Sequence, residues 1–299
     1  MRGVSEPRSS VTPLAGGHSG RTFVGEAGGE RTVVRIYPPG DVRGATAPEV
    51  DRAVLHLVRG LVPVPEVVEL VREHQASGRP GLLVTSWMPG VRGDLVLPGL
   101  DAAGMERLGR AMGTTAATLA GMPCLRPGLF VDAELTLGDL PGAGLPEWVE
   151  SRLTRWEATA RARLAEIAEQ AQAVLDAVGR ACLVHGDLNP KNVLVDPDTL
   201  GLTAVLDWEF AHAGHPWTDV GNLVRFERHP AYVSGVVGAW TSLRGGDEQQ
   251  LLDGARAADL WALVDLAARA GDNPVADRAE RLLRAVADSG DLHAWPFAT

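Results

Sequence analysis

The sequence predicts an α+β fold of two lobes, a β-rich N-terminal lobe and a mainly helical C-terminal lobe that contains one β-hairpin. Three observations predict it. Short β-branched runs separated by glycine turns fill the N-terminal part, apolar residues at helical spacing dominate after residue 101, and two aliphatic runs near residue 200 flank an Asp-Pro-Asp turn. We expect the N-terminal lobe at residues 1–87 and the C-terminal lobe at residues 88–299.

The N-terminal lobe is expected to hold strands around a single helix. A helix is expected from Ala47, because apolar residues recur at helical spacing from Val50 to Val58. Met88-Pro89-Gly90 breaks the last strand, and a run rich in Gly and Pro follows to Gly99, which marks the lobe boundary. The expected strands cover residues 11–15, 21–27, 32–37, 66–73 and 81–87.

The C-terminal lobe reads as helical. Asp101 is placed to cap its first helix, and a loop over residues 121–146 separates that helix from a longer one, in which an apolar stripe runs from Leu153 to Val178. The hairpin strands are expected at 193–195 and 203–206. Further helices are expected at residues 219–226, 231–243, 248–270 and 275–286.

The composition is that of a globular protein with a surplus of acid. The chain has 299 residues, 45% of them hydrophobic and 22% charged, and a formal net charge of −10. Nucleic acids and anionic membranes attract clustered Lys and Arg, so the charge argues against both as partners and is compatible with a cationic ligand. The N-terminus shows no apolar leader and no long apolar run appears, so we expect a cytoplasmic location.

Cysteine and lysine are both rare. Cys124 and Cys182 lie far apart and neither belongs to a CxxC pair, so neither a disulfide framework nor a zinc site is expected. Of the 28 basic residues, Lys191 is the single lysine. It is therefore the one side-chain amine available to any site in the sequence.

The stretch from Leu183 to Glu209 carries the strongest chemical signal. Asp187 lies five residues before Asn192, and Asp207 ends the second hairpin strand. Carboxylate and amide oxygens suit Mg²⁺, and phosphoryl transfer needs such a metal together with an acceptor hydroxyl held in line. The arrangement therefore suits phosphoryl transfer, although taken singly these residues also fit an Asx turn and a strand-end cap.

Two motifs in this stretch resemble those of the aminoglycoside phosphotransferase family, which is related in fold to protein kinases. They are HGDLNPKN at residues 185–192 and LDWE at residues 206–209. The segment 215–221, the Gly16-Gly17 turn and the Val-Pro-Val-Pro run at 62–65 also stand in the family's order. The resemblance covers about residues 11–290 and implies a protein-kinase-like fold.

The resemblance implies a role for each matching residue. Asp187 is similar to the catalytic acid/base, and Asn192 and Asp207 to the metal ligands. His185 and Asp219 are similar to residues that support the catalytic loop. The implied nucleotide contacts are Gly17, His18, Ser19, Gly20, Arg35, Ser86, Trp87, Met88 and Lys191. The implied cofactors are Mg²⁺ and ATP or GTP as phosphate donor, although the glycine turn by itself also fits an ordinary hairpin turn.

The sequence departs from the family at the phosphate-binding lysine, where the third strand carries Arg35. Arginine is always charged and can bind phosphate through two parallel hydrogen bonds, so the role is retained in principle. The helix partner of Arg35 is expected to be Asp51, with Glu49 as second candidate. Lys191 either contacts the γ-phosphate or forms a surface ion pair, and Glu209 either orients the acceptor or pairs with an arginine.

The acceptor implied by the resemblance is a hydroxyl of a small cationic molecule. The first hypothesis is an antibiotic phosphotransferase that confers resistance and acts on an aminoglycoside or on a cyclic peptide of the capreomycin or viomycin type. The alternatives are a metabolic kinase for choline, homoserine, a sugar or a fructosamine, and a non-catalytic pseudokinase that serves as a binding module. We expect a monomer or homodimer. Candidate acceptor contacts are Glu209, Glu227, Asp259 and Asp265, then Asp132, Glu134 and Asp272.

Overall fold

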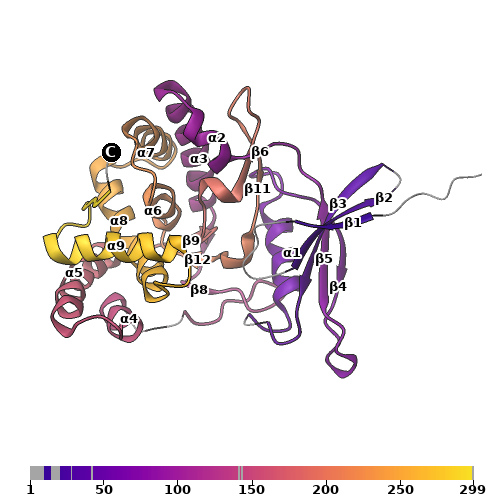
Figure 1. Cartoon of the computed structure of the whole chain (residues 1–299), viewed down its shortest axis with the longest axis horizontal. Helices are drawn as coiled ribbons and strands as arrows, with labels where there is room; N and C mark the ends of the chain where they lie inside the picture. Colours follow the sequence, from indigo (N-terminus) through magenta and orange to yellow (C-terminus); the bar gives the residue numbers. More distant parts are fainter. Residues whose placement is uncertain are drawn as a thin grey trace, which may run out of the picture. The chain divides into compact units, whose positions relative to one another are not determined.

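The computed structural model describes residues 10–14, 21–27, 29–41, 43–140, 142 and 144–297. The chain divides into two compact units (Figure 1). The first comprises Met1–Pro98, Leu129–Gly138 and Lys191–Ala211, and the second comprises Gly99–Gly128, Asp139–Pro190 and His212–Thr299. The predicted hairpin lies in Lys191–Ala211 and therefore belongs to the same compact unit as the N-terminal sheet. The lobe boundary between residues 87 and 88 stays a prediction.

An antiparallel sheet forms the first layer of the first unit (Figure 1). Its strands are β1 (Ser10–Pro13), β2 (Arg21–Ala27), β3 (Glu30–Tyr37), β4 (Val67–Val71) and β5 (Gly81–Ser86), in the order β1-β2-β3-β5-β4. Within β3, Arg35 pairs with Thr22 on one side and Leu83 on the other. The central strand therefore holds the backbone of Arg35 through neighbours on both sides.

Helix α1 (Ala47–Val58) packs against β4 and β5. Pro48 stands in its first turn, where a missing N–H costs nothing. The buried face carries Val54, Leu55 and Val58, and it also includes Asp51, which is 4% exposed. The apolar stripe thus also brings a carboxylate into the first unit.

The predicted hairpin forms from β10 (Val193–Val195) and β11 (Leu202–Val205). The carboxylate of Asp196 closes its turn by accepting hydrogen bonds from the backbone N–H groups of Asp198 at 2.9 Å and Thr199 at 3.0 Å. Strand β6 (Val91–Arg92) pairs with the other side of β10, and the short helix α2 (Gly93–Val96) follows β6.

Helices dominate the second unit (Figure 1). As predicted, Asp101 caps the first of them, because its carboxylate accepts a hydrogen bond from the N–H of Gly104 at 2.7 Å. None of the described helices is long and apolar enough to cross a bilayer. The helices are α3 (Ala102–Ala120), α4 (Leu145–Arg152), α5 (Ala158–Asp176), α6 (Thr218–Val224), α7 (Pro230–Arg244), α8 (Glu248–Ala268) and α9 (Pro274–Ser289).

Short strands link these helices. β9 (Ala181–Val184) pairs antiparallel with β7 (Pro123–Cys124) and with β12 (His212–Gly214), and β8 (Gly128–Leu129) starts where the chain leaves this unit. All four residues of β9 are buried. The chain remains buried at His185 and becomes partly exposed at Gly186 and Asp187.

The long helix predicted over Leu153 to Val178 is wrong in its first part. Helix α4 ends at Arg152, and the chain turns through residues 153–157 before α5 begins at Ala158. Leu153 and Trp156 are only 1% and 6% exposed although neither is helical. Their spacing indicates that both residues are buried, not that they are helical. The apolar pattern therefore continues across the non-helical residues between α4 and α5.

Helices α3 and α7 pack with their backbones in close approach. A Cβ atom on Gly109 or Gly113 of α3 would clash with the carbonyl oxygen of Tyr232 or Val236 of α7. A Cβ on Gly235 of α7 would clash with the backbone of α3 in the same way. Glycine is therefore required on both faces of this contact.

We expect Gly113→Ala to destabilise the protein. The clash is with a backbone oxygen and costs about 2–3 kcal/mol of unfolding free energy, which exceeds the gain of about 1 kcal/mol in helix propensity. Urea unfolding followed by circular dichroism measures the difference. Gly179→Ala is the matched control, because nothing lies within 4 Å of its Cβ position. Equal stability of the Gly113→Ala protein and the wild type would contradict the close packing.

Candidate active site

A buried carboxylate holds the loop that follows β9. Asp219, in the first turn of α6, is 2% exposed and accepts hydrogen bonds from the backbone N–H groups of His185 at 2.9 Å and Gly186 at 3.0 Å. Gly186 has a φ of 81°, in the left-handed region that favours glycine. Burial raises the pKa of Asp219, while His185 and these hydrogen bonds act in the opposite direction.

The carboxylate of Asp187 is oriented within its own loop. The amide of Asn189 donates to Asp187 Oδ1 at 3.0 Å and to the Asp187 carbonyl oxygen at 2.9 Å. The backbone N–H of Asp187 donates to Nδ1 of the fully buried His185 at 3.2 Å, which leaves Nε2 as the protonated nitrogen of the neutral ring. Asn189 was not among the predicted site residues, although its position two residues after Asp187 is an Asx-type signal.

In the first unit, the hairpin brings together Asn192 and Asp207, the two predicted metal ligands. The N–H of Leu206 donates to the Asn192 carbonyl oxygen at 2.8 Å, and Asp207 follows directly. Asn192 is 6% exposed, and Asp207 has a φ of 63°, which aspartate tolerates better than most residues. A carboxylate and an amide oxygen at one hairpin end fit Mg²⁺, which proteins often hold with one or two carboxylates and substrate phosphates.

Arg35 bridges two carboxylates beside this hairpin end. Its Nη1 lies 3.0 Å from Asp207 Oδ1, and its Nη2 hydrogen-bonds Glu209 Oε2. The Glu209 side chain is 6% exposed and that of Arg35 is 18% exposed. Pairing with an arginine, one of the two roles predicted for Glu209, is therefore what the structure shows.

Asp51, the expected partner of Arg35, makes other contacts. Its carboxylate accepts hydrogen bonds from the Tyr37 hydroxyl at 2.6 Å and from Arg43 Nη1 at 2.7 Å. Tyr37 lies two residues after Arg35 on the same strand face, so its hydroxyl takes the position facing Asp51. The hydrogen bonds to Asp207 and Glu209 thus add to the predicted partner, because the charge of Asp51 also acts on Arg35. The sequence missed Arg43, which stands in a loop without periodic signal.

The second candidate partner of Arg35 is also engaged elsewhere. Glu49 Oε1 lies 3.1 Å from Nε of the exposed Arg72. The described hydrogen bonds of Arg35 therefore go to Asp207 and Glu209, and not to Asp51 or Glu49 of α1.

Four further predicted nucleotide contacts belong to the first unit, namely Ser86, Trp87, Met88 and Lys191. Ser86 ends β5, and its N–H and hydroxyl both bond the backbone of Glu66, at 2.8 Å and 2.9 Å. Trp87 lies under the guanidinium of Arg31, 4.7 Å from the ring centroid. Met88 follows, with its sulfur 3.8 Å from the Ser86 hydroxyl, and Lys191 is exposed in a short helical turn. Gly17, His18, Ser19 and Gly20 lie outside the described residues.

Several carboxylates predicted to hold a cationic acceptor are paired inside the second unit. Asp259 is 4% exposed, and both its oxygens accept from Nε of Arg225, at 2.9 and 3.1 Å. Asp265 lies 3.1 Å from Arg269 Nη2. Glu227 accepts a hydrogen bond from the N–H of His229 at 2.8 Å.

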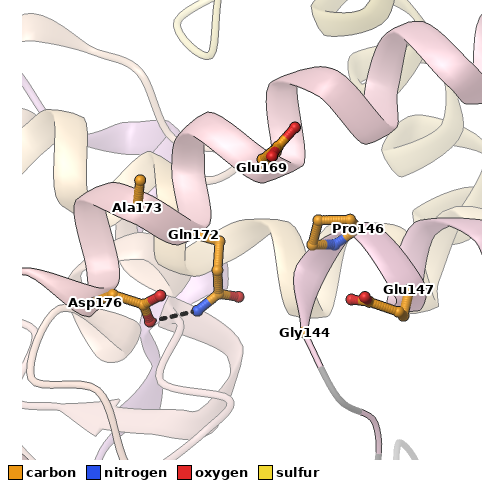
Figure 2. A pocket seen from close by; sticks show the side chains of 7 residues that line it. All are labelled: Gly144, Pro146, Glu147, Glu169, Gln172, Ala173 and Asp176. Atoms are coloured by element: carbon orange, nitrogen blue, oxygen red, sulfur yellow. Dashed lines mark hydrogen bonds between the residues drawn. The ribbon is translucent and has the colours of Figure 1, made fainter.

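A groove of about 470 Å³ lies along α4 and α5, and Figure 2 shows its polar lining. Gln172 connects its two sides, donating to Asp176 at 2.7 Å and accepting from the N–H of Leu145 at 3.0 Å. Its carboxylates lie on exposed helix surfaces, and no predicted site residue lines it. The lining residues are Gly144, Pro146, Glu147, Glu169, Gln172, Ala173 and Asp176.

Comparison with known families decides the classification. Residues 10–252 match the model of the phosphotransferase enzyme family APH, a span that includes the catalytic-loop motif at 185–192 and the hairpin motif at 206–209. The chain belongs to this family. The resemblance predicted from the two motifs is confirmed, and the protein is a phosphotransferase.

Solved structures share the fold. Aminoglycoside phosphotransferase APH(4)-Ia, in a ternary complex with ADP and hygromycin B, is 19% identical over 94% of both chains, with a TM-score of 0.64. A microcompartment-associated aminopropanol kinase is 21% identical, covering 94% of this chain and 91% of its own, with a TM-score of 0.65. The predicted α+β, protein-kinase-like fold is confirmed by these likenesses.

A curated relative is much longer than this chain. Acyl-CoA dehydrogenase family member 11 of Mus musculus is 26% identical over 232 residues, which make up 74% of this chain and 28% of the relative. This chain therefore spans little more than a quarter of that relative's length.

His215 lies in the segment between β12 and α6. Its Nδ1 accepts a hydrogen bond from the N–H of Trp217 at 3.2 Å, and the two rings lie 4.9 Å apart. Burial lowers the pKa of His215 from 6.5 to about 4, against smaller opposing effects of the Leu175 carbonyl and the Asp176 carboxylate. The folded state therefore favours the neutral ring.

We expect His215 to make the protein less stable as the pH falls from about 6.5 to about 4, because the unfolded chain binds a proton there and the folded chain does not. After allowance for partial exposure, the loss is about 2 kcal/mol. Urea unfolding at pH 7, 5.5 and 4.5 should show a shallower decline in His215→Gln than in the wild type. His56→Gln, on the exposed face of α1, should keep the wild-type slope. Identical slopes in all three proteins would contradict the assignment.

Proposed function

We propose that the protein transfers the γ-phosphate of ATP or GTP to a hydroxyl of a small molecule, with Mg²⁺ as cofactor. The observation that carries the proposal is the group formed by Arg35, Asp207 and Glu209 beside Asn192, in a chain of a phosphotransferase family. Phosphoryl transfer depends mainly on neutralising phosphate charge and positioning the acceptor. This group supplies oxygen ligands and a fixed cation for the first of these tasks.

Asn192 and Asp207 would hold the Mg²⁺, which when bound neutralises negative charge on the donor phosphates. The guanidinium group of Arg35 has several N–H donors. It can therefore keep the hydrogen bond from Nη2 to Glu209 and exchange the one from Nη1 to Asp207 for a phosphate oxygen. Glu209 is thus proposed to orient Arg35, and Asp51 to fix the neighbouring Arg43 and Tyr37.

Asp187 is proposed to orient the acceptor hydroxyl and to receive its proton. Asn189 holds one of its oxygens at 3.0 Å, which fixes the carboxylate for that task. His185 would support the loop by accepting a hydrogen bond from the N–H of Asp187 at Nδ1. Asp219 would support it by accepting hydrogen bonds from the N–H groups of His185 and Gly186.

The remaining nucleotide contacts are proposals by family likeness. The glycine turn would meet phosphate oxygens, the hinge would meet the purine, and Lys191 would reach the γ-phosphate. These residues are Gly17, His18, Ser19, Gly20, Ser86, Trp87, Met88 and Lys191.

Two acceptor classes are proposed. A cationic antibiotic, whose phosphorylation would confer resistance, is supported by the likeness to a phosphotransferase solved with hygromycin B. A metabolic hydroxyl compound is supported by the likeness to an aminopropanol kinase and to part of an acyl-CoA dehydrogenase family member. The pairing of Asp259 and Asp265 with arginines argues against their use in binding a cationic acceptor of either class, because their charge is already compensated by the protein.

An acceptor panel tests the function. The protein is incubated with Mg²⁺ and ATP or GTP, together with aminoglycosides, cyclic peptide antibiotics, amino alcohols, sugars and hydroxy acids, and mass spectrometry records the gain of one phosphate. Phosphorylation of at least one hydroxyl compound supports the proposal. Tight nucleotide binding without nucleotide consumption, with or without any acceptor, would instead identify a non-catalytic binding module.

Replacement of Asp187 by Asn should lower kcat by about 10² to 10⁴-fold, because general base positioning is lost while the volume is kept. Circular dichroism should show an unchanged fold. Asp288→Asn, on the exposed face of α9, makes the same chemical change away from the loop and should leave kcat unchanged. Full activity in Asp187→Asn would overturn the role assigned to this residue.

Replacement of Glu209 by Gln should raise the KM for nucleotide by about tenfold, because a charge-assisted hydrogen bond that orients Arg35 is lost. Steady-state kinetics with varied nucleotide measures the effect. Glu66→Gln removes an exposed ion pair with Arg59 in the same unit and should leave the KM unchanged. A lower KM in Glu209→Gln would show that Glu209 competes with phosphate for Arg35 rather than orienting it.

A further inference from the structure

Three arginines gather in the second unit around one buried carboxylate. Arg225 follows α6, Arg228 lies between α6 and α7, and Arg256 lies on α8. Asp259, one turn along α8 from Arg256, is engaged by Arg225, whose Nε and Nη2 lie 2.9 Å and 2.7 Å from Asp259 Oδ1. Arg225 also lies within electrostatic range of Asp187. These three arginines, the arginine cluster, are connected to the loop that carries Asp187 through α6, because Asp219 of that helix binds the backbone of His185 and Gly186 and Arg225 directly follows the helix.

Arg228 and Arg256 have no carboxylate partner among the described residues. Arg228 Nη1 donates to the His293 carbonyl oxygen at 3.3 Å, and Arg256 Nη1 donates to the carbonyl oxygen of Val224. The Nε atom of each is buried without a hydrogen-bond partner. Arg256 is only 5% exposed, so its guanidinium lies in the core of the second unit.

The unsatisfied groups of this cluster are donors. The amide oxygen of Asn222 accepts from Arg225 Nη2, and its Nδ2 is buried without a partner, like the two Nε atoms. A buried donor without an acceptor, and a buried charge without a counter-charge, both cost free energy. A ligand that brings acceptor atoms and negative charge can compensate this surplus of donors at Arg228, the partly exposed member of the three arginines.

The electrostatics agree with this geometry. Burial lowers the pKa of Arg256 to about 9, and the positive charge of Arg228 adds to that effect. Burial lowers the pKa of Arg228 to about 10, with Asp259 and Asp291 in opposition. Burial is the main cause of both shifts, and repulsion by neighbouring arginines adds to it only at Arg256.

We propose that the arginine cluster binds an oxyanion, a carboxylate or a phosphate, carried by the acceptor whose hydroxyl Asp187 orients. The inference rests on the proposed phosphotransfer and narrows its acceptor to anionic hydroxyl compounds. Arg225 remains paired with Asp259. Arg228 is only partly buried, so it is the arginine of the cluster that a ligand can reach from solvent. A guanidinium group can meet a carboxylate or phosphate with two parallel hydrogen bonds, which suits this task.

The competing explanation is structural, because Arg256 and Arg228 also cap the carbonyl groups of Val224 and His293. Anion binding separates the two explanations. Inorganic phosphate is titrated calorimetrically into the protein saturated with Mg²⁺ and ADP, at constant ionic strength set with sodium chloride. The wild type should bind phosphate, and Arg228→Gln should weaken the binding by about tenfold or more.

Matched variants complete the binding experiment. Arg163→Gln removes the same charge from an exposed position on α5 and should bind phosphate like the wild type. Arg228→Lys, which keeps the charge and loses the planar fork, should fall between wild type and Arg228→Gln. If circular dichroism shows that Arg228→Gln is unfolded, Arg256→Lys replaces it, with the same expected direction. Equal phosphate affinity in folded Arg228→Gln and wild type would overturn the proposal.

An acceptor panel tests the link to phosphotransfer. Hydroxy carboxylates and phosphorylated alcohols are compared with neutral polyols and cationic amino alcohols of similar size. The anionic compounds should be phosphorylated, and Arg228→Gln should raise their KM by about tenfold or more while kcat changes little. Turnover confined to neutral or cationic compounds, equal in wild type and Arg228→Gln, would overturn the anion site and leave phosphotransfer intact. A lack of nucleotide consumption with every acceptor would count against phosphotransfer itself, whatever the phosphate titration shows.

Discussion

The buried carboxylate of Asp219 is the contact on which the second unit's chemistry depends. It replaces water for two backbone N–H groups at the start of the catalytic loop, and its place in the first turn of α6 puts negative charge where the helix dipole favours it. Arg225, which follows the same short helix, is fixed by Asp259 of α8. One element thus connects the loop that carries Asp187 with the arginine cluster, so that both are positioned by the packing of α6.

In the first unit, the main electrostatic feature is the pairing of Arg35 with carboxylates. Arg35 lies on a central strand, where its charge needs partners within the protein. Two carboxylates are these partners, and both come from the segment that follows the hairpin. The helix carboxylate of α1 is used instead to hold Tyr37 and Arg43.

Local sequence signals predicted much of the fold, because strand alternation, helix caps and turn residues act over a few positions. The capping of α3 by Asp101 and the Asp196 turn are examples. The break before α5 was missed because Leu153 and Trp156 keep helical spacing while lying in a turn. The hairpin predicted from the sequence does bring Asn192 and Asp207 to one end, while the roles of these residues and of Asp187 stay predictions. Arg43 and the arginine cluster were missed because their partners are distant in sequence and no motif marks them.

The single lysine has a practical consequence. Lys191 is exposed and stands one residue before Asn192, in the short turn that follows the catalytic loop. A reagent selective for side-chain amines would therefore attach a fluorophore or a spin label at one internal position without any mutagenesis. The composition of this chain thus supplies a natural spectroscopic reporter for movements of the loop, in a protein whose other positive side chains are arginines.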